Sequence, residues 1–474
     1  MSDVNIIRSS ILTASLESSS FGETPAEGEL YVPLSHIKAL KLNSQVVVGG
    51  RGVGKSFWTA VLRSEDLRTT MQDFVPELQN LKISVGFSNI ESISSYPNED
   101  TFQLLLKEEY EPYDIWKAVI IRWVASQSSH LIPVTDWKST IDWLKTEPES
   151  AATLMEKQRN WRGLIVFDAL DRTSNDWQKM DDIVRGLLRA VLWLKSYSGL
   201  YAKVFLREDQ AERTVFNFPD ASKILATKAE LLWSRHDLHG LLWQRLINAP
   251  GDAGVLFRDF CTKVTEKSIN LIADSYHIPD EMKRESDAQR KAFSMLAGPW
   301  MGKDKRRGVP YTWCVNHLSD GRGLTSPRSF LAAISQSVED SMSRYPNHDF
   351  ALHYESIKRG IQKASEIRVT EVAEDYPWVP DVLSTLKGLN VPSDYSLVEQ
   401  KWTDRYPDGP HQVNPSRLPA QHAERGWTGI KEDLESLGMI ETKKDGRIDL
   451  PDLYRVGFGL GRKGGVKPRT LKTD

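Results

Sequence analysis

Runs of apolar residues and stretches of alternating apolar and polar residues mark the strands of one predicted sheet. Val46 to Val48 and Leu164 to Phe167 are uninterrupted apolar runs, which are typical of strands buried on both faces of a parallel sheet. Leu81 to Phe87 alternates as a half-buried strand does. Two shorter candidates follow at Ala202 to Leu206 and Glu230 to Trp233. Strands separated by helical stretches favour an α/β fold with a parallel sheet.

Helical periodicity fills much of the chain between and after these strands. Apolar residues recur at spacings of three and four from about residue 100 to 160, which predicts a helical insertion into the sheet unit. A further helix is predicted by the apolar face between Ile183 and Leu192. From His236 onward the pattern stays helical, with segments near residues 254–275 and 281–297.

The last part of the chain carries a helix followed by a hairpin. Trp427 to Leu437 has helical periodicity, and the turn at Lys444-Asp445-Gly446-Arg447 lies between two short strand candidates. An Asp-Gly turn between strands is a strong hairpin signal, and a helix followed by such a hairpin predicts a winged-helix-like domain. A basic tail then ends the chain, with Arg462, Lys463, Lys467, Arg469 and Lys472 against Asp474.

Composition narrows the class of protein. A chain of 474 residues exceeds the ~100–200 residues of a common domain, so we expect several packed units. With 61 basic and 64 acidic residues, the formal net charge of −3 disfavours a globally basic nucleic-acid-coating protein. The two cysteines, Cys261 and Cys314, have no metal-site or disulfide spacing. Neither a signal peptide nor a stretch of ~20 apolar residues is apparent, so we expect a cytoplasmic protein without membrane contact.

The strongest chemical signal follows the first apolar run. The residues Gly49-Gly50-Arg51-Gly52-Val53-Gly54-Lys55-Ser56 match G-x-x-x-x-G-K-[ST], and a helix-compatible stretch begins at Phe57. In this context the glycines let backbone N–H groups turn toward an anion, and the helix N-terminus adds positive potential. Lys55 would bind the β- and γ-phosphates, and Ser56 would bind Mg²⁺. A glycine-rich turn with a solvated Lys55 is the alternative; we predict a P-loop for ATP and Mg²⁺.

Two charged residues follow the ends of later strand candidates. Asp168 ends the second long apolar run, and ligands bind outside the carboxyl ends of strands in open α/β sheets. We therefore expect Asp168 to support Mg²⁺ together with Ser56. Arg207 occupies the matching position on another strand, where its guanidinium could contact the γ-phosphate. An ion pair with the neighbouring Glu208 or Asp209 is the alternative for Arg207.

These signals divide the chain into four expected segments. An N-terminal arm and lead-in would occupy residues 1–44, and a P-loop ATPase core residues 45–235. A helical lid would occupy residues 236–345, and a helical linker with the winged-helix-like domain residues 346–474. Within the lid, Ser326 and Pro327 open a helix, so that Arg328 would project from its first turn.

Four motifs in this order resemble those of a known class of ATPases: GGRGVGKS, LIVFDALDR, KVFLRED and TSPRSFL. The chain resembles the AAA+/STAND superclass, and most of all its KAP-type and bacterial defence-associated members, over about residues 40 to 345. The resemblance implies a parallel five-stranded sheet flanked by helices, with a small helical lid. It also implies that Lys55 and Ser56 hold phosphate and Mg²⁺, that Asp168 supports the metal, and that Arg207 and Arg328 sense the nucleotide.

One departure from this class concerns catalysis. Many AAA+ ATPases carry a Glu directly after the strand-terminal Asp to polarise the attacking water, but this chain has Ala169 there. The next carboxylate is Asp171, to which we assign the role of base; an ion pair with Arg172 is the alternative. Turnover would be slow if Asp171 lies far from the water. An arginine that acts across a subunit boundary could be Arg172, Arg213 or Arg322.

Three functions are compatible with these features. The first is an ATP-binding and hydrolysing regulatory ATPase, a switch or assembly platform of a prokaryotic defence or signalling system. It would form homo-oligomers or work with a separate effector protein, since the sequence offers no second catalytic constellation. The second is a DNA-engaging AAA+ ATPase, similar to origin-recognition proteins or transposition regulators, that binds DNA through the winged helix. The third, a P-loop kinase for a small substrate, is disfavoured by the long lid and tail.

Overall fold

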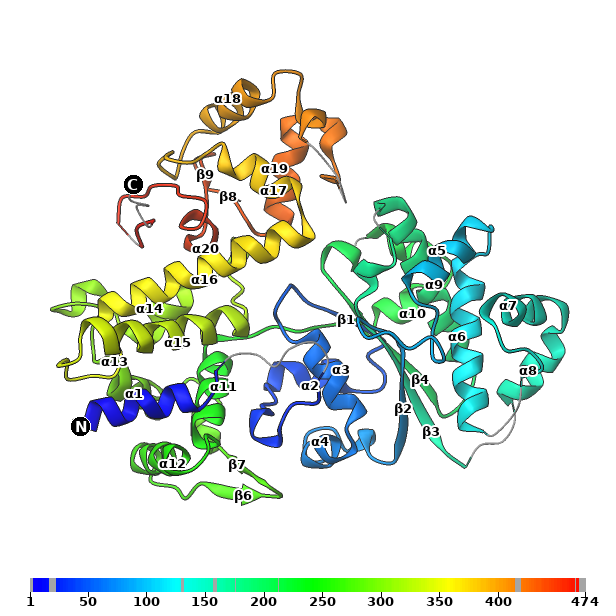
Figure 1. The fold of residues 1–474 in the computed structure, drawn as a ribbon, viewed down its shortest axis with the longest axis horizontal. Helices are drawn as coiled ribbons and strands as arrows, with labels where there is room; N and C mark the ends of the chain where they lie inside the picture. Colours follow the sequence, from blue (N-terminus) through cyan, green and yellow to red (C-terminus); the bar gives the residue numbers. More distant parts are fainter. Residues whose placement is uncertain are drawn as a thin grey trace. The chain divides into compact units, whose positions relative to one another are not determined.

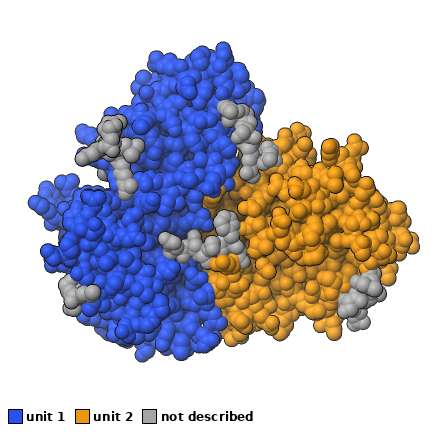
Figure 2. Space-filling model, in the orientation of Figure 1, with its two compact units in different colours: residues 1–18, 26–33, 233–474 blue, residues 19–25, 34–232 orange. Residues whose placement is uncertain are grey.

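The structure is a computed structural model that describes residues 3–16, 23–128, 132–156, 160–174, 176–211, 213–413, 419–464 and 466–468. The chain forms two units (Figure 2). Unit 2 consists of Ser19–Pro25 and Leu34–Leu232, and unit 1 of Met1–Ser18, Ala26–Pro33 and Trp233–Asp474. The predicted ATPase core at residues 45–235 thus corresponds to most of unit 2, whereas the predicted lid and C-terminal segment both belong to unit 1.

The elements of unit 2 are α2 (Ile37–Leu40), β1 (Val46–Val48), α3 (Lys55–Arg63), α4 (Glu65–Thr70), β2 (Leu81–Phe87), α5 (Glu99–Lys107), α6 (Pro112–Gln127), α7 (Trp137–Thr146), α8 (Pro148–Glu156), β3 (Arg162–Phe167), α9 (Trp177–Leu194), β4 (Leu200–Leu206), α10 (Ser222–Leu225) and β5 (Ala229–Glu230). The elements of unit 1 are α1 (Asp3–Thr13), α11 (Arg235–Ile247), α12 (Asp252–Thr265), β6 (Asn270–Ile272), β7 (Ser275–His277), α13 (Asp287–Ala297), α14 (Pro310–Asn316), α15 (Pro327–Arg344), α16 (Tyr354–Asp375), α17 (Trp378–Ser384), α18 (Tyr395–Arg405), α19 (Trp427–Ser436), β8 (Glu441–Thr442), β9 (Ile448–Asp449) and α20 (Asp452–Arg455).

Unit 2 is built on a parallel five-stranded sheet with the order β2-β3-β4-β1-β5 (Figure 1). The side chains of β1 and the apolar residues of β3 are buried, as their uninterrupted apolar runs predict. The strands β3 and β4 each begin two residues earlier than predicted. The last strand was predicted at Glu230 to Trp233, but β5 spans Ala229–Glu230. The predicted α/β class with a parallel sheet is confirmed.

The insertion predicted between residues 100 and 160 is helical. It contributes α5 to α8, of which α6 packs against β2 and α9, while α9 packs against β4. Trp116 of α6 is fully buried, and its indole N–H donates a hydrogen bond to the carbonyl of Ile183 in α9. The insertion therefore covers the sheet through packing.

A buried lysine ties β4 to the segment that leads into β1. The Lys203 ammonium is completely buried and donates hydrogen bonds to the carbonyls of Ala39, Lys41 and Ser44, at 2.6, 3.0 and 2.8 Å. Burial lowers the pKa of Lys203 to about 7. These contacts fix the chain just before the strand that carries the P-loop.

The segment expected as an N-terminal arm and lead-in includes a packed helix. Residues 3–13 form α1, which packs against α12 and α15 within unit 1. Its buried face includes the guanidinium of Arg8, which donates hydrogen bonds of 2.9 to 3.2 Å to the carbonyls of Tyr345, Pro346, Phe350 and Ala351. Because a charged residue and serines occupy this helix, its inward face lacks a clear apolar stripe.

The helical segment predicted near residues 254–275 is also wrong in part. The helix α12 ends at Thr265, and Glu266 follows in a left-handed conformation with φ of 56°. Residues 270–277 then form the antiparallel hairpin of β6 and β7. Leu271 and Ile272 seemed to extend the helical periodicity, but their side chains are 58% and 48% exposed, so they do not belong to a buried face.

The C-terminal helix and hairpin are confirmed. The helices α17, α18 and α19 precede the antiparallel pair β8–β9, and Ser393, between α17 and α18, forms an additional bridge with Ile448 of β9. This part of unit 1 therefore contains three helices followed by a hairpin, with one bridge from the α17–α18 connection to the hairpin. Of the basic tail, Arg469, Lys472 and Asp474 lie outside the described residues.

No helix among the described residues combines the length and the apolar character needed to cross a membrane.

Candidate nucleotide-binding site

The predicted P-loop connects β1 to α3 at the carboxyl edge of the sheet of unit 2. Gly52 and Gly54 have φ values of 77° and 103°, a left-handed conformation that glycine adopts without strain. Gly49 is needed for a different reason, because a Cβ there would meet Val53 at 2.6 Å. The helix α3 begins at Lys55, and its N-cap, Gly54, provides no side-chain cap. Its first N–H groups are therefore suited to an anion.

Lys55, Ser56 and Asp168 lie together at this edge. The Lys55 ammonium donates hydrogen bonds of 2.8 Å to the carbonyls of Gly49 and Gly50. The Ser56 hydroxyl donates a hydrogen bond of 2.7 Å to Asp168 Oδ2. Asp168 follows β3, and its own backbone N–H donates to the carbonyl of Phe87 at the end of β2. The sheet thus brings together residues that are 112 positions apart in the chain.

Burial shifts the pKa values of Lys55 and Asp168 in opposite directions, and the charge of each group opposes the shift of the other. Burial lowers the pKa of Lys55, while the negative charge of Asp168 opposes this shift. Burial likewise raises the pKa of Asp168, and the hydrogen bond from Ser56 and the charge of Lys55 oppose it. Each charge therefore opposes the effect of burial on the pKa of the other group.

This set of groups fits a magnesium-bound triphosphate. A serine hydroxyl and a carboxylate supply oxygen ligands, and Mg²⁺ is commonly held by one or two protein groups plus substrate phosphates. Among the described residues, no group of three or more His, Cys, Asp and Glu side chains could hold a metal ion on its own. A metal at Ser56 and Asp168 would therefore draw further ligands from phosphate oxygens and water.

Arg207 forms the ion pair that was the alternative to its role as a sensor. Its Nε and Nη2 contact the two carboxylate oxygens of Asp209 at 3.1 and 2.7 Å. Its third nitrogen, Nη1, lies 3.9 Å from the carboxylate of Asp171. Both Arg207 and Asp209 are buried, so the pair is shielded from solvent.

Asp171 lies in a short 3₁₀ turn, Leu170–Arg172, directly after Ala169. Ala169 has φ of 56°, which is uncommon for a residue with a Cβ. The Asp171 carboxylate is 29% exposed, and it faces Arg207, whereas the sequence suggested Arg172 as the alternative partner. Ala169 contributes no carboxylate, as the sequence indicates.

The remaining loop residues support the P-loop by packing. Phe57 contacts Trp58 edge to face at a centroid distance of 5.5 Å, and the Trp58 indole N–H donates a hydrogen bond of 3.1 Å to His36. Arg51 and Val53 are half-buried in the loop. Two acidic residues next to the site were not assigned to it from sequence: Asp209, the partner of Arg207, and Glu208. A Cβ at Gly50 would come within 3.8 Å of the Glu208 carboxylate.

Arg328 belongs to unit 1, in the first turn of α15. Its N-terminal neighbours Ser326 and Pro327 occupy the predicted N-cap and first helical positions. The Arg328 guanidinium forms an ion pair of 2.7 Å with Glu371 of α16. Of the other arginines considered for a role between subunits, Arg322 pairs with Asp320, and the side chain of Arg213 lies outside the described part of the chain.

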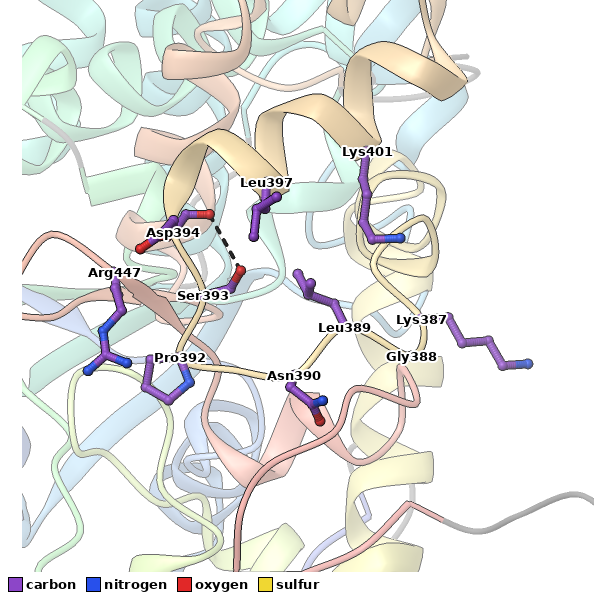
Figure 3. Close-up of a pocket in the computed structure, with 10 residues that line it drawn as sticks. All are labelled: Lys387, Gly388, Leu389, Asn390, Pro392, Ser393, Asp394, Leu397, Lys401 and Arg447. Carbon is purple, nitrogen blue, oxygen red and sulfur yellow. Dashed lines mark hydrogen bonds between the residues drawn. The ribbon is translucent and has the colours of Figure 1, made fainter.

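Unit 1 also contains a cavity of about 630 Å³ that involves none of the predicted site residues (Figure 3). It lies beside the α17–α18 connection and the turn of the β8–β9 hairpin. Its cations do not converge, since Lys387 and Arg447 lie at opposite ends of the view. The cavity is lined by Lys387, Gly388, Leu389, Asn390, Pro392, Ser393, Asp394, Leu397, Lys401 and Arg447.

Comparisons with known proteins add little to this geometry. No protein-family model matches the chain, and no curated protein matches it. Among solved structures, the chain is similar to the Aeropyrum pernix ORC2 protein, solved as ADPNP-ADP complexes, with 12% sequence identity and a TM-score of 0.28. That match covers 88% of this chain and 86% of the other. Similarity at this level assigns neither an activity nor a ligand.

Proposed function

We propose that this chain is a regulatory ATPase that binds ATP with Mg²⁺ and hydrolyses it slowly. The observation that carries the proposal is the 2.7 Å hydrogen bond between Ser56 and Asp168, beside Lys55 in a glycine-rich loop. In this proposal the loop amides and Lys55 bind the phosphates, and Ser56 and Asp168 hold Mg²⁺. Mg²⁺ would neutralise charge on the β- and γ-phosphates as the terminal bond breaks.

The carboxylates around the site support slow turnover. Asp171 would orient the attacking water and accept its proton. Arg207 Nη1 lies 3.9 Å from the Asp171 carboxylate, so the guanidinium and the attacking water would compete for this carboxylate. Ala169 supplies no second acid. Such an enzyme would remain in its ATP-bound state long enough to signal. In this proposal Arg207 would sense the terminal phosphate. Arg328, in the first turn of α15, would be a second residue that senses the nucleotide.

We further propose that the ATP state controls self-assembly or a separate effector protein in a prokaryotic defence or signalling system. This step depends on the sequence motifs, and it agrees with the described residues, which offer no three-residue His, Cys, Asp and Glu metal cluster for a second reaction.

The test of ATP binding is a calorimetric titration of the full chain with ATP in the presence of Mg²⁺. We expect saturable heat with ATP, and release of inorganic phosphate over longer incubation. Absence of heat with ATP, at protein concentrations where the chain is folded, would overturn the proposal.

A DNA-engaging ATPase is the second candidate, and the three helices followed by a hairpin in unit 1, the expected winged-helix-like domain, favour it. The hairpin turn carries Lys444 and Arg447, and Arg447 pairs with Asp445 at 2.7 Å. Against this candidate, α19 carries Glu432 and Glu435, and these charges would repel a DNA backbone. Asp433 of the same helix is buried against His422.

Fluorescence anisotropy of a labelled duplex measures whether DNA is a ligand. If the second candidate is right, the full chain binds the duplex, and affinity falls steeply between about 50 and 200 mM salt. Lys444→Glu would then weaken binding, whereas the exposed Lys223→Glu in unit 2 would not. Equal binding by both variants would show that the turn of the β8–β9 hairpin does not contact DNA.

A further inference from the structure

The cavity beside the α17–α18 connection has an apolar centre. The side chains of Leu389 and Leu397 point toward one another there (Figure 3). Leu397 is 48% exposed although it is apolar, so covering it with an apolar group of another molecule would be favourable. The cavity volume of about 630 Å³ lies within the ~300–1,000 Å³ that is common for ligand sites.

Three cations line the same cavity. Lys387 and Lys401 lie toward one end and Arg447 toward the other (Figure 3). Arg447 pairs with Asp445 at 2.7 Å, whereas neither lysine forms an ion pair with the residues that the structure describes. Among the described lining residues, Asp394 is the only acid. The lining therefore carries more positive than negative charge, at separated positions.

The connection at residues 389–393 also offers main-chain groups. Its outer side is paired with Gly461, which accepts a hydrogen bond of 3.0 Å from the N–H of Val391 and donates one of 2.8 Å to the carbonyl of Leu389. Asn390 lies between these two bonds and lines the cavity. Within the described part of the chain, its own backbone N–H and carbonyl have no hydrogen-bond partner. An extended peptide could form main-chain hydrogen bonds with Asn390, as in strand addition.

We propose that this cavity binds an extended acidic peptide of a partner protein. One apolar side chain of the peptide would lie between Leu389 and Leu397, and its acidic residues would contact the cations on both sides. Lys401 also lines a second cavity, of about 570 Å³, that contains Asp381 and Asp404. Because these two carboxylates would repel further acids, the acidic part of the peptide would end at Lys401.

The lining distinguishes a peptide from other anions. A compact anion such as free phosphate would reach the cations at one end only, because they are separated (Figure 3). Nucleic acid is disfavoured because the described lining residues include no aromatic side chain on which a base could stack. The inference goes beyond the proposed function, since the site requires no ATP.

Fluorescence anisotropy of a labelled peptide, in which one leucine lies between two short runs of glutamate, tests the site in the full chain without nucleotide. We expect saturable binding that weakens about 10-fold in Lys401→Glu, through loss of a charge-assisted contact. Leu397→Ala should weaken it severalfold, through loss of apolar contact. The matched control is Lys291→Glu, at an exposed position of α13 that does not line the cavity, and it should bind as the original chain does.

Two further peptides test the two halves of the recognition. Replacing every glutamate by glutamine, or the leucine by serine, should weaken binding to the original chain. The inference is overturned if the original chain does not bind the first peptide, if Lys401→Glu and Leu397→Ala bind it unchanged while thermal unfolding shows them folded, or if the serine peptide binds equally well. Tighter binding of a single-stranded thymidine oligonucleotide that displaces the peptide would assign the cavity to nucleic acid instead. None of these results depends on ATP binding, so failure here leaves the proposed function standing.

Discussion

Replacing Lys55 by alanine is expected to lower the affinity for ATP by about 100-fold or more. The ammonium contacts the carbonyls of Gly49 and Gly50, and truncating one partner of a buried charge pair, here the proposed pair of Lys55 and the phosphates, costs about 2–5 kcal/mol. Removing it leaves the phosphates without their cation and Asp168 without its counter-charge. Calorimetric titration with ATP and Mg²⁺ measures the loss.

The control for this variant is Lys223→Ala. Lys223 is exposed, pairs with Asp220 and lies on α10 of the same unit, so its loss should change ATP affinity little. If Lys55→Ala binds ATP as well as the original chain, the glycine-rich loop is a structural turn and the nucleotide site must be sought elsewhere.

Replacing Asp168 by asparagine is expected to reduce Mg²⁺-dependent ATP hydrolysis by about 10- to 100-fold, the usual effect of removing a group that orients a metal ligand. Asparagine has the same shape and can still accept the hydrogen bond from Ser56, but it brings no negative charge to the metal. Phosphate release at several Mg²⁺ concentrations measures the effect. The variant should need more Mg²⁺ to reach half of its maximal rate.

Stability separates this effect from unfolding. Asparagine can still accept the hydrogen bond from Ser56, and the midpoint of thermal unfolding, measured on the same sample, shows whether the variant is folded at the assay temperature. A variant that hydrolyses ATP normally at low Mg²⁺ would show that Asp168 does not support the metal. The control is Asp182→Asn, which changes an exposed partner of Arg185 on α9.

The strands and the glycine-rich loop between β1 and α3 could be predicted because their signals are local. An apolar run such as Leu164 to Phe167 indicates a buried strand without knowledge of its neighbours. The glycine, lysine and serine spacing of the loop reports backbone and side-chain chemistry in one short segment. The proximity of Ser56 and Asp168 then follows from parallel strands, whose carboxyl ends share one edge of the sheet.

Partners within the site could not be predicted, because they depend on rotamers and turns. The sequence Arg207-Glu208-Asp209 places two acids next to one arginine. The 3₁₀ turn after β4 determines that Asp209, and not Glu208, makes the two-point contact with the Arg207 guanidinium. Asp171 was expected to pair with Arg172 if it was not a base, yet it faces Arg207 from a neighbouring strand end.

Two segments of unit 1 were predicted wrongly because the burial of their residues differs from what the residue types suggest. In α1 the inward position belongs to Arg8, a residue whose type suggests exposure, and the carbonyls that satisfy it are more than 330 residues away in sequence. In the hairpin of β6 and β7, by contrast, apolar residues point to solvent. Residue type indicates burial only on average, and both errors arose where that average failed.

The contact made by Arg8 has a practical consequence for anyone who produces this protein. A truncated version that starts at the sheet of unit 2 would leave four main-chain oxygens between α15 and α16 without their hydrogen-bond donor. Expression plasmids should therefore retain the first helix, and affinity tags are better joined through a spacer that leaves it able to dock.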